Sequence, residues 1–266
     1  MHPLNDTDTS QIKEELEKNG YICLPLLSPE DCQELLDWHH KNQYAFGSGF
    51  RVTLFSDNIE YRFEAHELIL KVFSTALEKL FPGYTVIVGN FVTKDPTLNS
   101  EVPLHQDWTF VDEAKHRSIN IWCPLGDTYV ENGALQVVAG SHLISKENRG
   151  PGLPSAFMIN SPAIKDLLQP IPLKAGHAIC YDHALIHASG PNQSHSERVA
   201  VTMSLMPDEA QLRHCQLGEL DGKEVVEVLH VKPDFFKTLM IGEKLQPLPF
   251  HLVLLIDNGG AVPHQA

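Results

Sequence analysis

The sequence has no excess of positive charge. Its 266 residues include 20 Lys and Arg against 34 Asp and Glu, which gives a net charge of −14 and a pI near 5.4. A nucleic-acid surface needs a basic stripe that neutralises phosphates, so this composition argues against a nucleic-acid partner. The same charge disfavours a highly anionic substrate, although a local basic pocket would override the overall field.

Cysteine is sparse, and long apolar runs are absent. The five cysteines are widely spaced and form no Cys-x-x-Cys pair, so we expect free thiols and no disulfide framework. No run of eighteen or more apolar residues occurs, and no apolar segment follows the acidic start of the chain. We therefore expect no signal peptide, no membrane association and a cytoplasmic location.

The rest of the composition suits one globular unit. A 42% hydrophobic content over this length is enough for a single large core, and no internal repeat or low-complexity tract interrupts the chain. We expect one domain over residues 1–266. Its parts are a helical N-terminal portion (1–83), a strand-rich core (84–206) and a C-terminal extension (207–266).

Helical spacing is concentrated before residue 84. Apolar positions in Glu60–Phe81 repeat at helical intervals until Pro82 and Gly83 end the pattern, and we expect this helix to pack on a sheet. Residues 43–58 lack such a pattern and are expected to form a surface loop. The other expected helices are Gln11–Asn19 with Ser10 as its cap, Pro29 to about Asn42, and a short Lys232–Met240.

From residue 84 onward the pattern changes to short strands separated by turns. Asp221 and Gly222 predict a tight hairpin between Glu219 and Val228. Helices first and strands afterwards favour a sheet sandwich or barrel with helices on one face. The expected strands are 21–27, 84–93, 104–110, 117–124, 133–139, 171–173, 177–187 and 198–206.

The segment Leu104–Phe110 carries a His-x-Asp motif. In an extended strand His105 and Asp107 share a face and supply two of the three ligands of a 2-His-1-carboxylate Fe(II) site. The motif alone is weak, because 15 His and 15 Asp in 266 residues give roughly one such pair by chance. Trp108 and Phe110 follow Asp107 closely, and we expect one of them to line a pocket and the other to pack on the sheet.

A second histidine stands in a suitable context. His187 follows the apolar run 178–181 and precedes a Ser-Gly-Pro-Asn turn. Arg198 lies eleven residues further on and opens an alternating strand. We expect the loop 188–197 to join two antiparallel strands, which places a guanidinium beside the metal.

These residues, with short motifs between them, resemble the phytanoyl-CoA dioxygenase family of iron and 2-oxoglutarate oxygenases. The resemblance covers about Tyr21 to Met206, in the family's order and with family-like gaps. It rests on His105, Gln106 and Asp107, on Asn132, Gly133, Ala134 and Leu135, on Gly140, Ser141 and His142, and on His187, Ser189, Asn192 and Arg198.

The resemblance implies a mainly β fold with flanking helices and a double-stranded β-helix core, a cupin-like jelly roll with the ligands near one open end. It also implies an oxidoreductase that uses Fe(II), 2-oxoglutarate and O₂. Decarboxylation of 2-oxoglutarate to succinate would drive hydroxylation or another oxidation of a C–H bond in a small-to-medium metabolite. Asp107 favours hydroxylation, because halogenating relatives place a small residue at that position. Fatty acyl-CoA, amino acid and secondary-metabolite substrates all remain open, as does the oligomeric state.

Four further residues are candidates for contact with 2-oxoglutarate. Arg198 is expected to bind its far carboxylate through a bidentate fork, the alternative being a surface ion pair with Glu197. The resemblance implies that Trp122 lies beside the oxo acid, with core packing as its alternative. Asn90 and Lys94 could also reach the oxo acid, or could belong to a solvated strand end and turn.

Other histidines compete with His187 for the third ligand position. His183 is four residues earlier, His177 is ten earlier, and His195 begins a second His-x-acid pattern. Only His187 is followed both by the Ser-Gly-Pro-Asn turn and by an arginine eleven residues later, which is the spacing found in the family. Two other functions stay open: a non-catalytic jelly roll that senses a metal or ligand, and a cupin-like dioxygenase that uses no oxo acid.

Overall fold

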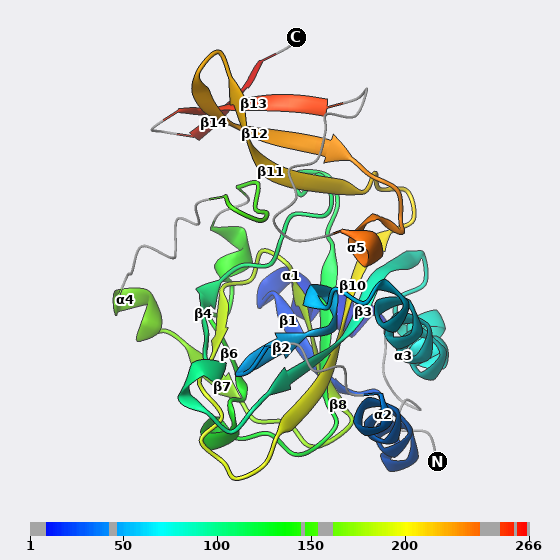
Figure 1. Cartoon of the computed structure of the whole chain (residues 1–266). Helices are drawn as coiled ribbons and strands as arrows, with labels where there is room; N and C mark the ends of the chain where they lie inside the picture. Colours follow the sequence, from blue (N-terminus) through cyan, green and yellow to red (C-terminus); the bar gives the residue numbers. More distant parts are fainter. Residues whose placement is uncertain are drawn as a thin grey trace.

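The computed structural model describes residues 9–42, 47–144, 147–153, 162–239, 251–257 and 260–264. Most of its regular structure is antiparallel sheet. Two sheets enclose a core, and the larger one is covered on its outer face by helices (Figure 1). The expected mainly β, jelly-roll fold with flanking helices is confirmed.

The larger sheet has six antiparallel strands in the order β1-β8-β5-β10-β3-β2. Because alternate side chains point to opposite faces, its central strands bury both faces. On β10, Val199, Val201 and Met203 pack with the helices, whereas Ala200 packs toward the smaller sheet. The strands are β1 (Tyr21–Pro25), β2 (Phe50–Val52), β3 (Tyr84–Lys94), β5 (Ile119–Pro124), β8 (His177–Asp182) and β10 (Arg198–Pro207).

The smaller sheet has four strands in the order β4-β9-β6-β7. Leu135 and Val137 of this sheet share an apolar cluster with Val92 and Trp122 of the larger one, so the core lies between the two sheets. The strands are β4 (Val102–His105), β6 (Leu135–Val137), β7 (Gln169–Ile171) and β9 (His187–Ser189).

Three helices cover the outer face of the larger sheet. The helix α3 (Ile59–Leu80) matches its prediction, and its Ile69 and Phe73 are fully buried in the helix-side core. The helix α2 (Pro29–Lys41) begins with a capping box in which the Ser28 hydroxyl accepts from the Asp31 amide while the Asp31 carboxylate accepts from the Ser28 amide. The helix α1 (Thr9–Lys18) precedes Gly20, whose φ of 80° suits glycine.

The structure differs from the predictions near both halves of the histidine motif. The predicted strand 104–110 stops at His105, because the Asp107 and Thr109 amides donate to the carbonyls of His183 and Arg149 instead of continuing a ladder. The predicted strand 177–187 is broken: β8 ends at Asp182, and the chain turns into the other sheet to form β9.

Two more expectations are corrected. The strands β9 and β10 do not pair with each other, since they belong to different sheets. The expected loop 43–58 contains β2 and a 3₁₀ turn (Thr53–Phe55). Hydrophobic periodicity shows that a segment is a strand, but it does not show which sheet the strand joins.

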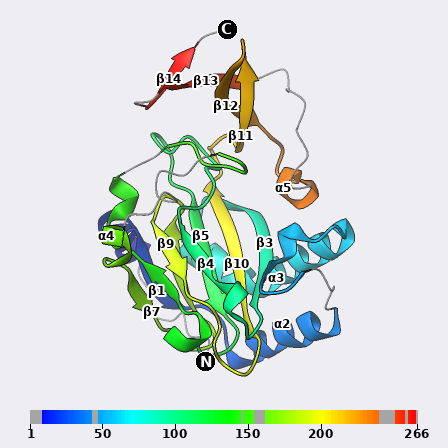
Figure 2. The same ribbon diagram turned by 60° about the vertical axis from the view of Figure 1, so that its left-hand side comes forward.

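A third sheet, β11-β12-β13-β14, follows the two-sheet core and lies beyond one end of it (Figure 1). The predicted hairpin is confirmed, with β11 (Arg213–Leu220) and β12 (Lys223–His230) joined by Asp221 and Gly222, both at positive φ. The expected 232–240 helix is the shorter α5 (Phe235–Thr238), which lies beside α3 and β3 (Figure 2). The remaining elements are α4 (Pro162–Lys165), β13 (His251–Asp257) and β14 (Gly260–His264).

All five cysteines are free thiols, as expected. Across the residues that the structure describes, none of the helices combines the length and the apolar character needed to cross a bilayer.

The packing of α3 on the larger sheet gives a stability prediction. Replacing the fully buried Phe73 by Ala removes its contacts and leaves a cavity, so we expect a loss of about 3–5 kcal/mol in the free energy of unfolding. Phe55→Ala is the matched control, because that side chain is 48% exposed and its loss should change stability by under about 1 kcal/mol. Urea unfolding of the two variants measures the difference, and equal losses would contradict the core assignment.

Candidate functional site

Three side chains meet at one end of the space between the sheets. His105 and His187 are paired residues on the neighbouring strands β4 and β9, and their ring centroids lie 4.1 Å apart. The Asp107 carboxylate reaches between them, with Oδ1 3.7 Å from Nε2 of His105 and 3.6 Å from Nε2 of His187. All the candidate ligand atoms lie within 4.8 Å of one another, which is close enough for one metal ion to touch all three.

Backbone carbonyls orient both imidazoles. Nδ1 of His105 lies 2.8 Å from the Pro103 carbonyl, and Nδ1 of His187 lies 2.9 Å from the Leu185 carbonyl. A carbonyl only accepts, so Nδ1 carries the proton in each ring and the Nε2 lone pair is left for a metal. This is the usual outer support of a histidine ligand.

The other oxygen of Asp107 is held from the larger sheet. Oδ2 accepts a hydrogen bond of 2.8 Å from the Asn120 side chain, which also donates to the Tyr181 hydroxyl and accepts from the Thr202 hydroxyl. Asn120, Tyr181 and Thr202 come from β5, β8 and β10. Side chains from three strands therefore orient the Asp107 carboxylate, although Asp107 itself lies in an irregular segment.

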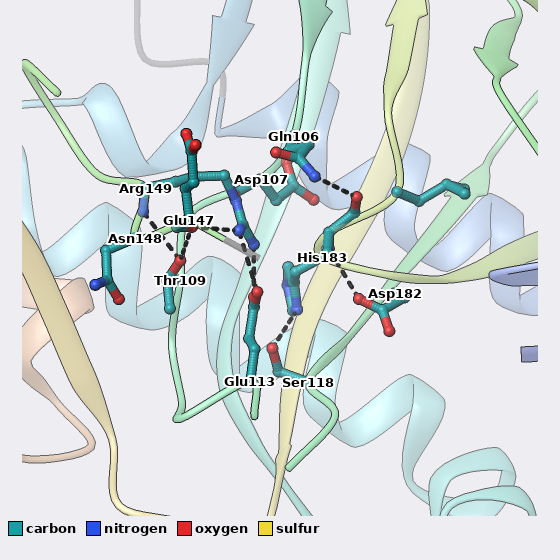
Figure 3. Close-up of polar contacts among 12 residues, drawn as sticks. Gln106, Asp107, Thr109, Glu113, Ser118, Glu147, Asn148, Arg149, Asp182 and His183 are labelled. Carbon is teal, nitrogen blue, oxygen red and sulfur yellow. Dashed lines mark hydrogen bonds and ion pairs between the residues drawn. The ribbon is translucent and has the colours of Figure 1, made fainter. Parts of the chain in front are cut away.

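A buried ion pair fixes the backbone of that segment (Figure 3). Nε of Arg149 donates to the Asp107 carbonyl at 2.7 Å, and the same guanidinium pairs with the buried Glu113 carboxylate. Thr109 and Arg149 also exchange hydrogen bonds. Arg149 thus connects the chain after the metal-ligand motif to the segment 147–153.

The electrostatics of the three ligands suit a cation. Burial raises the pKa of Asp107, but the neighbouring histidines outweigh burial and hold it well below its ordinary value, so the carboxylate stays charged. Burial and the charge of His105 lower the pKa of His187 to about 4, which keeps that imidazole neutral. Burial lowers the pKa of His105 as well, but its contact with Asp107 prevails and the net shift is upward.

Arg198 is buried beside Trp122. Its guanidinium carbon lies 5.2 Å from the centre of the indole ring, and its Nε has no hydrogen-bond partner among the described residues. Glu197, the alternative partner considered for it, pairs with Arg51 at 2.6 Å instead. Burial alone lowers the pKa of Arg198, to about 9, so the group is still charged at neutral pH.

Lys94 lies next to Arg198 as its paired residue on β3. It is fully buried, and its Nζ donates to the carbonyls of Ser189 and Gly190. Burial first, and the charge of Arg198 second, lower the pKa of Lys94 to about 7. Lys94 therefore braces the turn after β9, and it is not the solvated turn residue offered as the alternative.

A cavity of about 300 Å³ joins these groups. Both Trp108 and Phe110 line it, which corrects the expectation that only one would, since residues two apart in an extended segment tend to share a face. The cavity lining includes all seven residues predicted for the site: His105, Asp107, His187, Arg198, Trp122, Asn90 and Lys94.

The competing histidines lie elsewhere. His183 is buried in the turn after β8, where its ring bonds the hydroxyls of Ser118 and Ser204. His177 is exposed at the start of β8, and His195 is exposed in the loop before β10. The cluster that places ligand atoms together holds His187 and none of the other three.

Sequence reasoning missed several residues that support the site. Asn120 could have been predicted from the sequence, because it lies two residues before the candidate Trp122 and residues two apart on a strand share a face. Arg149 and Phe236 carried no such signal. Each lies in a segment whose approach to the cavity depends on the tertiary path of the chain.

Two comparisons place the chain among known sequences. It matches the family described as phytanoyl-CoA dioxygenase (PhyH) over residues 16–200. It is 31% identical over 131 residues to phytanoyl-CoA dioxygenase domain-containing protein 1 of Mus musculus, covering 46% of this chain and 44% of that protein, and so spans less than half the length of this relative. The Danio rerio protein of the same name is 25% identical over 272 residues, with coverage of 79% and 92%.

Solved structures share the fold. The epimerase SnoN, crystallised with Fe3+, alpha ketoglutarate and nogalamycin RO, superposes with a TM-score of 0.59 at 18% identity, covering 97% of this chain and 96% of that one. The non-heme alpha ketoglutarate dependent carbocyclase SnoK gives a TM-score of 0.56 at 21% identity, with coverage of 80% and 88%.

The family match extends over more than half of the chain and includes the three clustered ligands. It confirms the resemblance seen in the sequence. The chain belongs to the phytanoyl-CoA dioxygenase family.

Proposed function

We propose that this protein is an Fe(II)- and 2-oxoglutarate-dependent dioxygenase that oxidises a C–H bond of a small-to-medium metabolite, most simply by hydroxylation. The observation that carries the proposal is the meeting of His105, Asp107 and His187 in a cavity that also holds the buried Arg198, whose guanidinium has no acidic partner among the described residues. The three clustered ligands would bind the metal, and Arg198 would bind the distal carboxylate of 2-oxoglutarate.

The donor set fits ferrous iron. Two imidazole nitrogens and one carboxylate make up the ligand set typical of non-heme Fe(II) oxygenases, and the cluster found among the described residues includes no thiolate that would favour a softer metal. Bound iron supplies the activation of O₂ and the chelation of the oxo-acid group. One oxygen atom of O₂ then enters succinate and the other becomes the hydroxyl, with CO₂ released, and the oxo acid and the C–H bond each give up two electrons.

The far end of the cavity fits the distal carboxylate of 2-oxoglutarate. A guanidinium offers a planar fork that matches a carboxylate, and a buried one without an acidic partner gains most from receiving it. Trp122 supplies one wall against the arginine. The reading in which no oxo acid is used leaves this buried charge without a role.

The chain itself positions groups and excludes water. Asn120 holds the Asp107 carboxylate, and the backbone carbonyls of Pro103 and Leu185 keep the protons on Nδ1 of the histidines. Apolar side chains between the sheets keep the cavity dry, which strengthens the contacts of charged groups inside it.

The direct test is 2-oxoglutarate turnover by anaerobically reconstituted protein exposed to O₂. We expect slow release of succinate without substrate, and faster release when a metabolite library supplies the correct one. Metal binding without any succinate release would favour the non-catalytic sensor.

Removing the carboxylate ligand should abolish metal-dependent turnover. We expect Asp107→Ala to weaken Mn(II) binding by more than about 100-fold, because loss of even an outer partner of a ligand weakens metal affinity by about 10–100-fold. Asp112→Ala is the control, since its carboxylate pairs with Lys115 and Arg213 outside the ligand cluster. Titration followed by electron paramagnetic resonance measures both, and unchanged affinity in Asp107→Ala would remove this residue from the site.

Replacing the cavity arginine should affect the oxo acid and spare the metal. We expect Arg198→Gln to raise the apparent KM for 2-oxoglutarate about ten- to hundredfold, as lost charge-assisted hydrogen bonds of about 1.5–3 kcal/mol imply. Arg51→Gln, which breaks ion pairs with Asp95 and Glu197 instead, should leave that KM within about threefold. A KM that stays the same in Arg198→Gln would exclude its role.

Arg149 should act on metal binding through the backbone of Asp107. We expect Arg149→Lys, which keeps the charge beside Glu113 but loses the fork to the Asp107 carbonyl, to weaken Mn(II) binding about tenfold. Arg62→Lys is the matched control, because this equally buried arginine donates to carbonyls of Ser56 and Leu239 away from the metal. Similar Mn(II) affinities in the two variants would contradict a positioning role for Arg149.

A further inference from the structure

The side chains that β3 and β10 contribute to the cavity change from charged to uncharged along its length. On the face of these neighbouring strands that lines the cavity, the residue pairs are Lys94 with Arg198, Val92 with Ala200, Asn90 with Thr202, and Val88 with Ser204; all of these residues except Ala200 are in the lining. Residues two apart on a strand share a face, so the series begins with two cations and continues with uncharged side chains only.

The metal ligands lie beside the uncharged part of this series. Asn120, which is the paired residue of Ser204 on β5, bonds both the Asp107 carboxylate and the Thr202 hydroxyl, and this puts the ligand cluster near the Asn90–Thr202 and Val88–Ser204 pairs and away from Arg198. A 2-oxoglutarate held between Arg198 and the metal occupies the cationic side. The space left for a substrate is therefore the side toward Val88 and Ser204.

Aromatic rings wall that side. The ring centroids of Phe110 and Phe236 lie 4.9 Å apart at 83°, and Trp108 lies 6.3 Å from Phe236. Phe236 belongs to α5 and lines the cavity, so the C-terminal part of the chain supplies one wall. Leu54 and the half-exposed Phe55 of the 3₁₀ turn complete the lining at this side.

No charged side chain of the described residues lines this side of the cavity. Two histidines stand behind the rings, with His183 4.9 Å from Phe110 and His214 6.4 Å from Trp108. Burial lowers the pKa of His214 to about 4, so this imidazole is neutral at physiological pH. An anion placed here would lose its hydration without gaining a partner.

We propose that the chamber formed by Leu54, Phe55, Val88, Trp108, Phe110 and Phe236 is the substrate subsite, and that it takes a compact, uncharged, ring-containing apolar molecule. This inference rests on the proposed function, since it assigns the cationic end to 2-oxoglutarate. Flat walls set at steep angles to one another stack on the faces and edges of a ring. The size agrees with a compact molecule at this subsite, because the volume of about 300 Å³ that the substrate shares with the oxo acid is at the lower limit for ligand pockets.

The test uses two probes of the same shape, neutral 2-naphthamide and anionic 2-naphthoate. Binding to the anaerobic Fe(II)·2-oxoglutarate complex is measured by calorimetry, with the oxo acid saturating so that neither probe enters its site. We expect the amide to bind at least tenfold more tightly than the carboxylate. Equal affinities, or binding of neither probe, would overturn the proposal.

A charge introduced at the mouth tests the location. We expect Phe55→Lys to favour 2-naphthoate over 2-naphthamide by about tenfold relative to the unmodified protein, because the new ammonium offers the carboxylate a partner. The control is Leu98→Lys, which changes a side chain that is 74% exposed and does not line the cavity. An unchanged ratio in Phe55→Lys places the probe elsewhere and overturns the assignment of the chamber.

Separate titrations with Fe(II) and with 2-oxoglutarate distinguish the two levels of the proposal. If both bind and the probes do not discriminate, the substrate assignment fails and the dioxygenase function stands. If neither Fe(II) nor 2-oxoglutarate binds, the dioxygenase function fails, and the substrate assignment that rests on it fails too.

Discussion

The pairing of β4 with β9 is the interaction on which the site depends. It sets His105 directly opposite His187, residues that are far apart in the chain, and it brings both Nε2 atoms to the same carboxylate. The pairing is short, so it needs support from both sides. The neighbouring β6 holds β9 from one edge, and the irregular path after β4 is fixed by Arg149 and Glu113.

The two faces of the larger sheet have different roles. One face packs on helices and supplies stability, while the other carries the polar groups that aim Asp107 and the cations that would receive an oxo acid. Burying a cation beside another is unfavourable: burial first, and the charge of Arg198 second, lower the pKa of Lys94. A dianionic cosubstrate would relieve it, which gives a physical reason for a protein of net charge −14 to keep a cationic pocket.

Periodicity in the sequence was sufficient for the long helix, and spaced motifs together with the family resemblance were sufficient for the fold class and for choosing seven residues that line one cavity. It was not sufficient for the path of the chain between sheets. The break between Asp182 and His187 and the irregular segment after His105 are set by hydrogen bonds to distant residues, which periodicity does not record. For the same reason Arg149 and Phe236 became visible only when the tertiary structure brought them to the site.

The most direct measurement of the central claim is the visible absorption of the anaerobic protein titrated with Fe(II) and 2-oxoglutarate together. A charge-transfer band that requires both components and saturates at one iron per chain is the predicted result, because the oxo acid must chelate an ion held by His105, Asp107 and His187. Absence of the band when each component is saturating, or its full retention after both histidines are replaced, would contradict the account.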